Sequence, residues 1–332
     1  MSYTEAAEFE LAQTAAFGRT PDPAPIKAYA AKYPKSPLLK TAYGYLARYY
    51  QYYTPDQANA ADAAAKEKAA NGKLEASKFF DLYAAKYPED ASILNTYVDF
   101  VIKQKGPVEK GLEVAEKVKE LTGYPENPNY MQNLAELYVL KGDETKANEE
   151  YGKDFIDSYI STTVSALTSY ASFWLEKGKN LESVEATADL AAKMASPTQS
   201  YYLEQVAGIY LKLKKTDKAL GIFGPEFAKK NGGDANALIS YAAFWNRQGE
   251  NLGSALDAAK KSVALAPDYY NNFTLAQVLF KMKNYTEALP VAEKAVELVK
   301  PMVVKYQFPV APYETLVKQI KEAMAKGQKP AK

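Results

Sequence analysis

The segment LTSYASFWLEKGKNLESVEATA, residues 167–188, returns 71 residues later as LISYAAFWNRQGENLGSALDAA, residues 238–259. The two copies are identical at 11 of 22 positions, and the two tryptophans, Trp174 and Trp245, occupy the same place in each copy. A period of 71 residues is about twice the roughly 34-residue length of a helix-turn-helix repeat. The repeating unit is therefore predicted to be a pair of helical hairpins, and the whole chain to be one elongated repeat array.

The hairpins between these copies carry a second pattern. LAELY at residues 134–138 returns as VAGIY at residues 206–210, and a third copy has Leu275, Ala276 and Leu279. In each copy a small residue is followed three positions later by a large one, and twelve positions later by an alanine. Alanine at a helix crossing lets two helix axes approach, and the large side chain fills the adjacent gap.

This pattern resembles the tetratricopeptide repeat (TPR), and KKSVALAPD at residues 260–268 matches the end of such a repeat. The resemblance covers roughly residues 91–300. It implies an all-α, right-handed superhelical solenoid of about eight helical hairpins with a C-terminal capping helix, of a bacterial TPR-like type. We expect residues 1–92 to form irregular N-terminal hairpins, residues 93–300 to form the paired repeats, and residues 301–332 to form the capping helix and a frayed tail.

The predicted turns have residues suited to helix ends. Gly142, Gly178 and Gly249 stand where a left-handed C-terminal cap is wanted, and each is followed within two residues by a side chain that could cap the next helix. These expected N-terminal caps are Asp143, Asn180 and Asn251. The alanine-rich segment at residues 59–71 is predicted to be a helix from its propensity, with a mobile loop as the alternative.

Composition excludes several classes of function. Cysteine and histidine are both absent, which removes thiolate nucleophiles, imidazole bases and the usual zinc ligands. Lys and Arg total 41 against 40 Asp and Glu, with no basic block, so nucleic acid is not an expected partner. Charged residues interrupt the apolar runs before they reach membrane-spanning length. We therefore expect no catalysis, no cofactor, no metal and no membrane insertion.

The TPR resemblance implies that the first helix of each hairpin lines a concave groove. Small polar side chains on such a face can bond to the backbone of an extended peptide without demanding one sequence. A solvated face without a ligand also explains the same residues, and for any single residue it is the favoured interpretation. The candidate partner-binding residues are Asn95, Asp99, Asn133, Glu136, Ser169, Ser172, Gln205, Asn246, Arg247, Gln277 and Lys281.

Aromatic residues form a second candidate surface. The 27 tyrosines are densest at residues 43–53, where Tyr45, Tyr49 and Tyr52 or Tyr53 share one face of a helix. That face could stack on a peptide or a sugar, whereas the alternative is that these rings fill gaps between helices. Trp174 and Trp245 fall at the large packing position and are predicted to belong to the core.

The sequence thus predicts a protein-protein interaction scaffold that binds a peptide or protein in its groove. Two alternatives stay open: an accessory repeat segment of a larger bacterial thioredoxin-domain protein, and a self-assembling structural subunit. The first residues lack the pattern of a signal peptide. We therefore expect the protein to be cytoplasmic if this sequence is its full N-terminus, and periplasmic if a signal peptide was removed.

Overall fold

The computed structural model describes residues 2–18, 21–54, 62–123, 128–157, 163–196, 199–306 and 309–327. Within these ranges the regular structure is helical, with no strand. The chain divides into two compact units, Met1–Ser161 and Thr162–Lys332, and each is treated by itself below.

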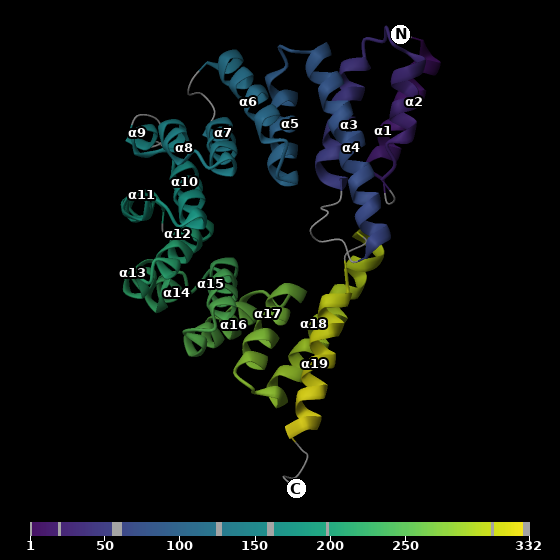
Figure 1. The fold of residues 1–332 in the computed structure, drawn as a ribbon. Helices are drawn as coiled ribbons and strands as arrows, with labels where there is room; N and C mark the ends of the chain where they lie inside the picture. The colour runs from purple at the N-terminus through teal and green to yellow at the C-terminus, as the bar shows by residue number, and fades with distance from the viewer. Residues whose placement is uncertain are drawn as a thin grey trace. The chain divides into compact units, whose positions relative to one another are not determined.

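The first unit is built from antiparallel hairpins in which each helix packs against the next (Figure 1). The hairpins pair α1 with α2, α3 with α4, α5 with α6, and α7 with α8, and the short α9 follows α8. The bounds are α1 (Tyr3–Ala16), α2 (Ala24–Lys32), α3 (Leu39–Tyr53), α4 (Ala63–Lys86), α5 (Ala91–Gln104), α6 (Val108–Thr122), α7 (Pro128–Lys141), α8 (Glu144–Tyr151) and α9 (Lys153–Phe155).

The second unit repeats this plan and ends in an additional helix. Its hairpins pair α10 with α11, α12 with α13, α15 with α16, and α17 with α18, and α19 packs against α18. The bounds are α10 (Val164–Lys177), α11 (Leu181–Met194), α12 (Ser200–Lys212), α13 (Thr216–Phe223), α14 (Pro225–Lys230), α15 (Ala235–Gln248), α16 (Leu252–Leu265), α17 (Tyr269–Lys281), α18 (Tyr285–Tyr306) and α19 (Ala311–Gly327).

These pairs confirm the predicted all-α array of about eight hairpins with a C-terminal helix in the part of the chain that the structure describes. The alanine-rich segment is helical from Ala63 onward, while residues 59–61 and the predicted tail at 328–332 lie outside the described residues. The handedness of a superhelix and the division at residues 92 and 300 stay predictions.

The positions that the repeat register predicts to be packing positions are buried in the core. Trp174 and Trp245 are fully buried, and the indole Nε1 of Trp245 donates to the carbonyl oxygen of Phe223 at 2.7 Å. Because both tryptophans belong to the second unit, their fluorescence reports on that unit alone. Both are therefore packing residues, as predicted.

The small residues of the repeat lie at close helix contacts. Ala207, Ala242 and Ala276 have no exposed surface. Gly111 makes a still closer contact on α6, because a Cβ there would lie 2.7 Å from Cγ1 of Val101 on α5 and 2.9 Å from Cδ2 of Leu137 on α7. Helices that approach this closely tolerate little additional side-chain volume.

Enlarging one of these alanines should destabilise the protein. We expect Ala207→Leu, Ala242→Leu and Ala276→Leu each to lower the free energy of unfolding by about 1 to 3 kcal/mol, because the additional carbon atoms force neighbouring helices apart. Urea denaturation followed by tryptophan fluorescence measures the change. An unchanged urea midpoint for all three variants would contradict the assigned register.

Helix ends follow the sequence prediction in part. Gly142, Gly178 and Gly249 have φ values of 85°, 65° and 76°, which confirms the left-handed caps, and Asp143 accepts a hydrogen bond from the backbone N–H of Lys146. The prediction was wrong for Asn180 and Asn251, whose side chains do not cap the following helix. Their backbones are left-handed instead, with φ of 53° and 51°. Asparagine tolerates that conformation better than most residues.

Tyrosines in the first helix of a hairpin bind carboxylates on the preceding second helix. The hydroxyl of Tyr97 on α5 donates to Asp81 on α4 at 2.8 Å. Tyr138 on α7 donates to Glu116 on α6 at 2.8 Å, and Tyr210 on α12 donates to Asp189 on α11 at 2.6 Å. This contact recurs at three junctions between successive hairpins, and at each of the three it places an acidic residue on the second-helix side.

Candidate functional site: polar faces of the first helices

The first helices of successive hairpins contact one another within each unit, α1 to α3 to α5 to α7 and α10 to α12 to α15 to α17. In the first unit this contact brings three predicted residues together. Asn133 on α7 donates through Nδ2 to Oδ1 of Asn95 at 3.1 Å and to Oδ1 of Asp99 at 2.6 Å. Gln51 on α3, which the sequence analysis missed, donates to Oδ2 of Asp99 at 3.0 Å.

Asp99 is the centre of this network. Burial raises the pKa of its carboxyl group, and the amide donors of Asn133 and Gln51 offset part of that rise. Both donors are neutral, and no cation pairs with Asp99 in the described part of the chain. Much of the hydrogen-bonding capacity of these predicted residues is therefore used within the protein.

In the second unit the predicted residues Asn246, Arg247 and Lys281 meet at the C-terminal end of α15. The Lys281 ammonium on α17 donates to the backbone carbonyl oxygens of Asn246 and Arg247. A cation at this end of a helix stabilises its dipole and its unpaired carbonyl groups. Lys103 on α5 makes a similar contact in the first unit, where its Nζ lies 2.7 Å from the carbonyl oxygen of Gln51.

Arg247 forms an ion pair with Glu204 on α12, the residue next to the predicted Gln205. Burial raises the pKa of Glu204, and the charge of Arg247 opposes that rise. The side-chain oxygen of Asn246 is buried and lacks a hydrogen-bond donor in the structure. Arg247 and Lys281 therefore support the packing of α12, α15 and α17, and reversing their charges would test stability as well as binding.

The other predicted residues lie on α7, α10, α12 and α17. Glu136 is half-buried on α7 and Ser169 is exposed on α10, whereas Ser172, Gln205 and Gln277 are half-buried. No side-chain hydrogen bond connects Ser169, Ser172, Gln205 or Gln277 to another described residue. Their polar groups remain accessible on the first-helix face, so their proposed contact with a partner stays a prediction.

The tyrosine cluster on α3 divides between the core and the surface. Tyr50 is buried, Tyr45 and Tyr49 are half-buried, and Tyr52 and Tyr53 are exposed. The ring centroid of Tyr45 lies 5.9 Å from that of Phe17 on the adjoining turn of α1. The cluster is thus partly interhelical filling and partly an accessible aromatic surface.

Arg48 lies between two hollows in this surface. One hollow, about 320 Å³, is bordered by α3, α4 and α5, and the other, about 370 Å³, by α1 and α3. Arg48 and Tyr45 border both. The guanidinium of Arg48 is exposed and makes no hydrogen bond or ion pair with a described residue. We name the surface formed by these two hollows the Arg48 face.

A buried tyrosine also borders the hollow that α3, α4 and α5 form in the Arg48 face. The side chain of Tyr83 on α4 is 2% exposed, and its hydroxyl has no hydrogen-bond partner in the structure. Burial, assisted by the charge of nearby Asp90, raises the pKa of Tyr83. Thr41 and Ser92 add hydroxyl groups, and Lys40 adds an ammonium that lies 2.9 Å from Asp90. The hollow is rich in hydrogen-bond donors.

The rarity of arginine in the sequence could have drawn attention to Arg48. The chain contains three arginines, Arg19, Arg48 and Arg247, among its 41 basic residues. Arg19 lies outside the described residues, and the other two both stand on first helices. Because the chain uses lysine almost everywhere else, Arg48 and Arg247 stand out as positions with a planar cation that can form several hydrogen bonds.

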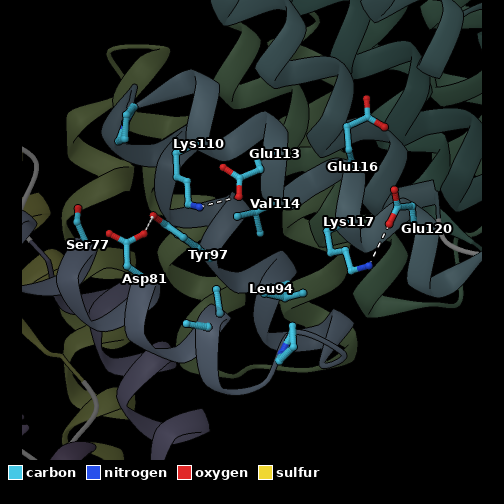
Figure 2. A pocket seen from close by; sticks show the side chains of 14 residues that line it. Ser77, Asp81, Leu94, Tyr97, Lys110, Glu113, Val114, Glu116, Lys117 and Glu120 are labelled. Carbon is cyan, nitrogen blue, oxygen red and sulfur yellow. Dashed lines mark hydrogen bonds and ion pairs between the residues drawn. The ribbon is translucent and has the colours of Figure 1, made fainter.

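A third opening lies between two second helices of the first unit, and Figure 2 shows the side chains that line it. Its volume is about 860 Å³, and its walls are α4 and α6. Leu94 and Tyr97 of α5 and Val114 of α6 provide apolar surface. We name it the α4–α6 groove. Nothing in the sequence analysis predicted it.

Among known proteins, the chain is similar to solved structures only. No family model matches the chain, and no curated protein sequence matches it. A tetratricopeptide repeat protein from Parabacteroides merdae is similar over 84% of this chain and 100% of its own, at 16% identity and a TM-score of 0.44. A Naa15/Naa10 structure bound to HypK-THB is 15% identical, covering 92% of this chain and 57% of its own, with a TM-score of 0.40. The APC/C Cut9-Hcn1 hetero-tetramer is 11% identical, covering 96% and 64%, with a TM-score of 0.34.

The alanines and large residues of the sequence pattern are buried in successive helical hairpins, as the pattern predicted. The chain has a TPR-like repeat fold. Among the described helices none combines the length and apolar character needed to cross a bilayer. The described acidic residues form no group of three or more arranged to hold a metal ion.

Proposed function

We propose that the chain is a non-catalytic interaction scaffold, and that the Arg48 face binds a carboxylate-bearing segment of a partner protein. The observation that carries this proposal is the unpartnered guanidinium of Arg48 between two hollows. A planar guanidinium binds a carboxylate through two parallel hydrogen bonds, which gives both orientation and affinity.

The surroundings of Arg48 suit a bound acidic group. The exposed hydroxyl groups of Thr41 and Ser92 can each donate a hydrogen bond into the hollow between α3 and α5. The neighbouring rings of Tyr45 and Phe17 provide apolar surface for the adjacent residues of the segment. Donors and apolar surface side by side are what an extended peptide needs for its acidic side chain and its neighbours.

The proposal also explains why the predicted polar residues differ in role. Asn133 on α7 donates hydrogen bonds to both Asn95 and Asp99 on α5, so these contacts hold α5 and α7 together. A partner segment that extends along the first helices would meet this network after leaving the hollow. The predicted contacts on α10, α12, α15 and α17 belong to the same proposal for the second unit.

Charge reversal at Arg48 tests the proposal. We expect Arg48→Glu to reduce partner capture from a source-cell lysate by at least about tenfold, because a charge-assisted hydrogen bond contributes about 1.5 to 3 kcal/mol. Quantitative mass spectrometry measures the captured proteins. Circular dichroism should show an unchanged urea midpoint, since Arg48 has no partner in the protein to lose.

Lys66→Glu is the matched control, because Lys66 is an exposed cation on α4 of the same hairpin and lines neither hollow. Lys66→Glu should capture the same proteins as the unaltered chain. Equal capture by the Arg48 variant and the control would overturn the proposal. Partners lost by both variants would indicate a general electrostatic effect and would also count against it.

A further inference from the structure

The α4–α6 groove has the dimensions of a helix-binding site. Its α4 wall runs from Ser77 to Ala85, about 12 Å, and its α6 wall runs from Lys110 to Glu120, about 15 Å, at 1.5 Å per helical residue. An occupant of matching length is a helix of about ten residues, or three turns. Both walls are helices whose backbone groups are bonded internally, so the groove offers no strand edge to an extended chain.

The floor of the groove is apolar, with Leu94 and Tyr97 from α5, Val114 from α6, and the small Ala84 and Ala85 from α4. The same face of α4 continues to Leu74, which is 54% exposed. An exposed bulky apolar side chain next to an apolar floor favours an occupant with an apolar stripe of its own.

The charges around this floor are unequal. Asp81, Glu113, Glu116 and Glu120 face two lysines, Lys110 and Lys117. Each lysine is already paired one turn along α6, Lys110 with Glu113 at 2.8 Å and Lys117 with Glu120 at 3.0 Å, as Figure 2 shows. The two remaining carboxylates, Asp81 and Glu116, accept hydrogen bonds from neutral tyrosine hydroxyls.

Asp81 and Glu116 therefore leave two negative charges beside the apolar floor, one on each wall. Their partners, Tyr97 and Tyr138, orient the carboxylates without neutralising them. In the second unit the equivalent carboxylate differs, because Asp189 accepts from Tyr210 and is also held by Lys218 at 2.7 Å. The α4–α6 groove thus keeps an acidic character that the matching junction in the second unit lacks.

From this geometry we infer that the α4–α6 groove binds an amphipathic helix of a partner protein, with an apolar stripe on the floor and lysine or arginine residues on both flanks. The basic flanks lie against Asp81 on one wall and Glu116 on the other. This second surface is independent of the Arg48 face, which lies on the first-helix side and takes the opposite charge.

Two synthetic helical peptides of eleven residues test the inference by fluorescence anisotropy. Both carry the same leucine and alanine stripe, and their flanking residues are all lysine in one and all glutamate in the other. We expect the lysine peptide to bind at least about tenfold more tightly than the glutamate peptide at low salt, and to lose that advantage as salt rises. Equal binding of the two peptides would overturn the inference.

Variants of the groove locate the binding. Ala85→Arg places a long side chain over the floor and should abolish binding of the lysine peptide. Ala64→Arg makes the same substitution at an exposed position near the start of α4, outside the groove, and should bind normally. Retained binding by Ala85→Arg would place the peptide elsewhere and overturn the inference.

A double variant tests how much the two carboxylate charges contribute to peptide binding. Asp81→Asn combined with Glu116→Gln keeps an acceptor for each tyrosine hydroxyl while removing both charges. It should bring the affinities for the two peptides to within about twofold of each other, and an undiminished preference for lysine would overturn the inference. Arg48→Glu should leave the peptide affinity unchanged, so failure of the proposed function and failure of this inference are distinguishable. A groove closed by a second copy of the chain, seen as a dimer in analytical ultracentrifugation that the peptide does not dissociate, would also overturn it.

Discussion

Gly224→Ala is expected to lower the free energy of unfolding of the second unit by about 3 kcal/mol or more, which is at the upper end for overpacking. Gly224 joins α13 to α14 with φ of −101° and ψ of −163°. A Cβ atom at this position would lie 2.1 Å from the carbonyl oxygen of Leu220 and 2.8 Å from its carbonyl carbon. Backbone atoms cannot rotate away as a side chain can, so the connection between the two helices would have to change.

Gly221→Ala is the matched control three residues earlier. Gly221 lies on the exposed side of α13, and no atom comes within 4 Å of an added Cβ. Alanine there should raise stability by roughly 0.5 to 1 kcal/mol, because it reduces the conformational entropy of the unfolded chain. The two glycine-to-alanine changes are therefore expected to have opposite signs.

Urea denaturation followed by tryptophan fluorescence measures both variants in the second unit. Equal midpoints for Gly224→Ala and Gly221→Ala would contradict the steric argument. Gly152 provides a second test in the first unit, because a Cβ there would lie 2.1 Å from the carbonyl oxygen of Asn148. Gly152→Ala should behave like Gly224→Ala when the unfolding is followed by circular dichroism.

These two glycines show where sequence analysis stopped. The sequence did not identify Gly152 as the joint between α8 and α9, or Gly224 as the joint between α13 and α14. Glycine is an obvious turn signal where φ is positive, as at Gly178 and Gly249. At Gly152 and Gly224 it is required by the close approach of a carbonyl group in the preceding turn, which only the folded backbone reveals.

The repeat register was predictable because it depends on local size patterns. Alanine and large residues recur at fixed spacing, and each copy supports the others. The polar contacts were less predictable, since Asn133 meets Asp99 across 34 residues and Arg247 meets Glu204 across 43. The sequence placed such residues on one face, whereas the choice of partner depends on the offset between neighbouring helices.

The α4–α6 groove lay beyond the sequence for a related reason. Phe80 of α4 packs on Tyr97 with ring centroids 4.9 Å apart and on Phe100 at 5.1 Å. These rings come from two different helices, α4 and α5. The aromatic residues were visible in the sequence, but the choice of which rings pack together depends on the three-dimensional packing of the helices.

Stability should fall steeply above about pH 10, where unfolded tyrosine begins to ionise. Burial raises the pKa of Tyr83, Tyr97 and Tyr241, and it raises that of Tyr313 to about 12. A group with a raised pKa in the folded state keeps its proton after the unfolded chain has lost its own. Its contribution is therefore fully present below pH 10 and is lost as pH rises from there through the folded pKa. The other tyrosines shifted in this direction are Tyr29, Tyr49, Tyr50, Tyr138 and Tyr210.

The shifted carboxyl groups are not expected to make stability depend on pH near neutrality. Burial raises the pKa of Asp99 and Glu204, whereas ion pairs with lysine lower that of Glu8, Glu185 and Glu287. The raised carboxyl groups lose stability as pH rises past their unfolded pKa near 4, and the lowered ones lose it as pH falls below that value. With no histidine in the chain, stability is expected to be nearly constant between pH 6 and pH 8.

Urea denaturation from pH 6 to pH 11 measures the whole dependence. Each tyrosine that retains its proton only in the folded state adds about 1.4 kcal/mol per pH unit to the slope above pH 10, so several together should unfold the chain within about one pH unit. Tyr210→Phe removes one such proton, while Asp189 keeps its ion pair with Lys218, and the alkaline slope should fall by the share of one group.

Constant stability up to pH 11 would show that the tyrosine hydroxyls are open to solvent, and it would contradict the burial on which the contacts between successive hairpins depend. A change above about 1.4 kcal/mol between pH 6 and pH 8 would instead reveal a strongly shifted carboxyl or lysine side chain, and a catalytic role would then have to be considered.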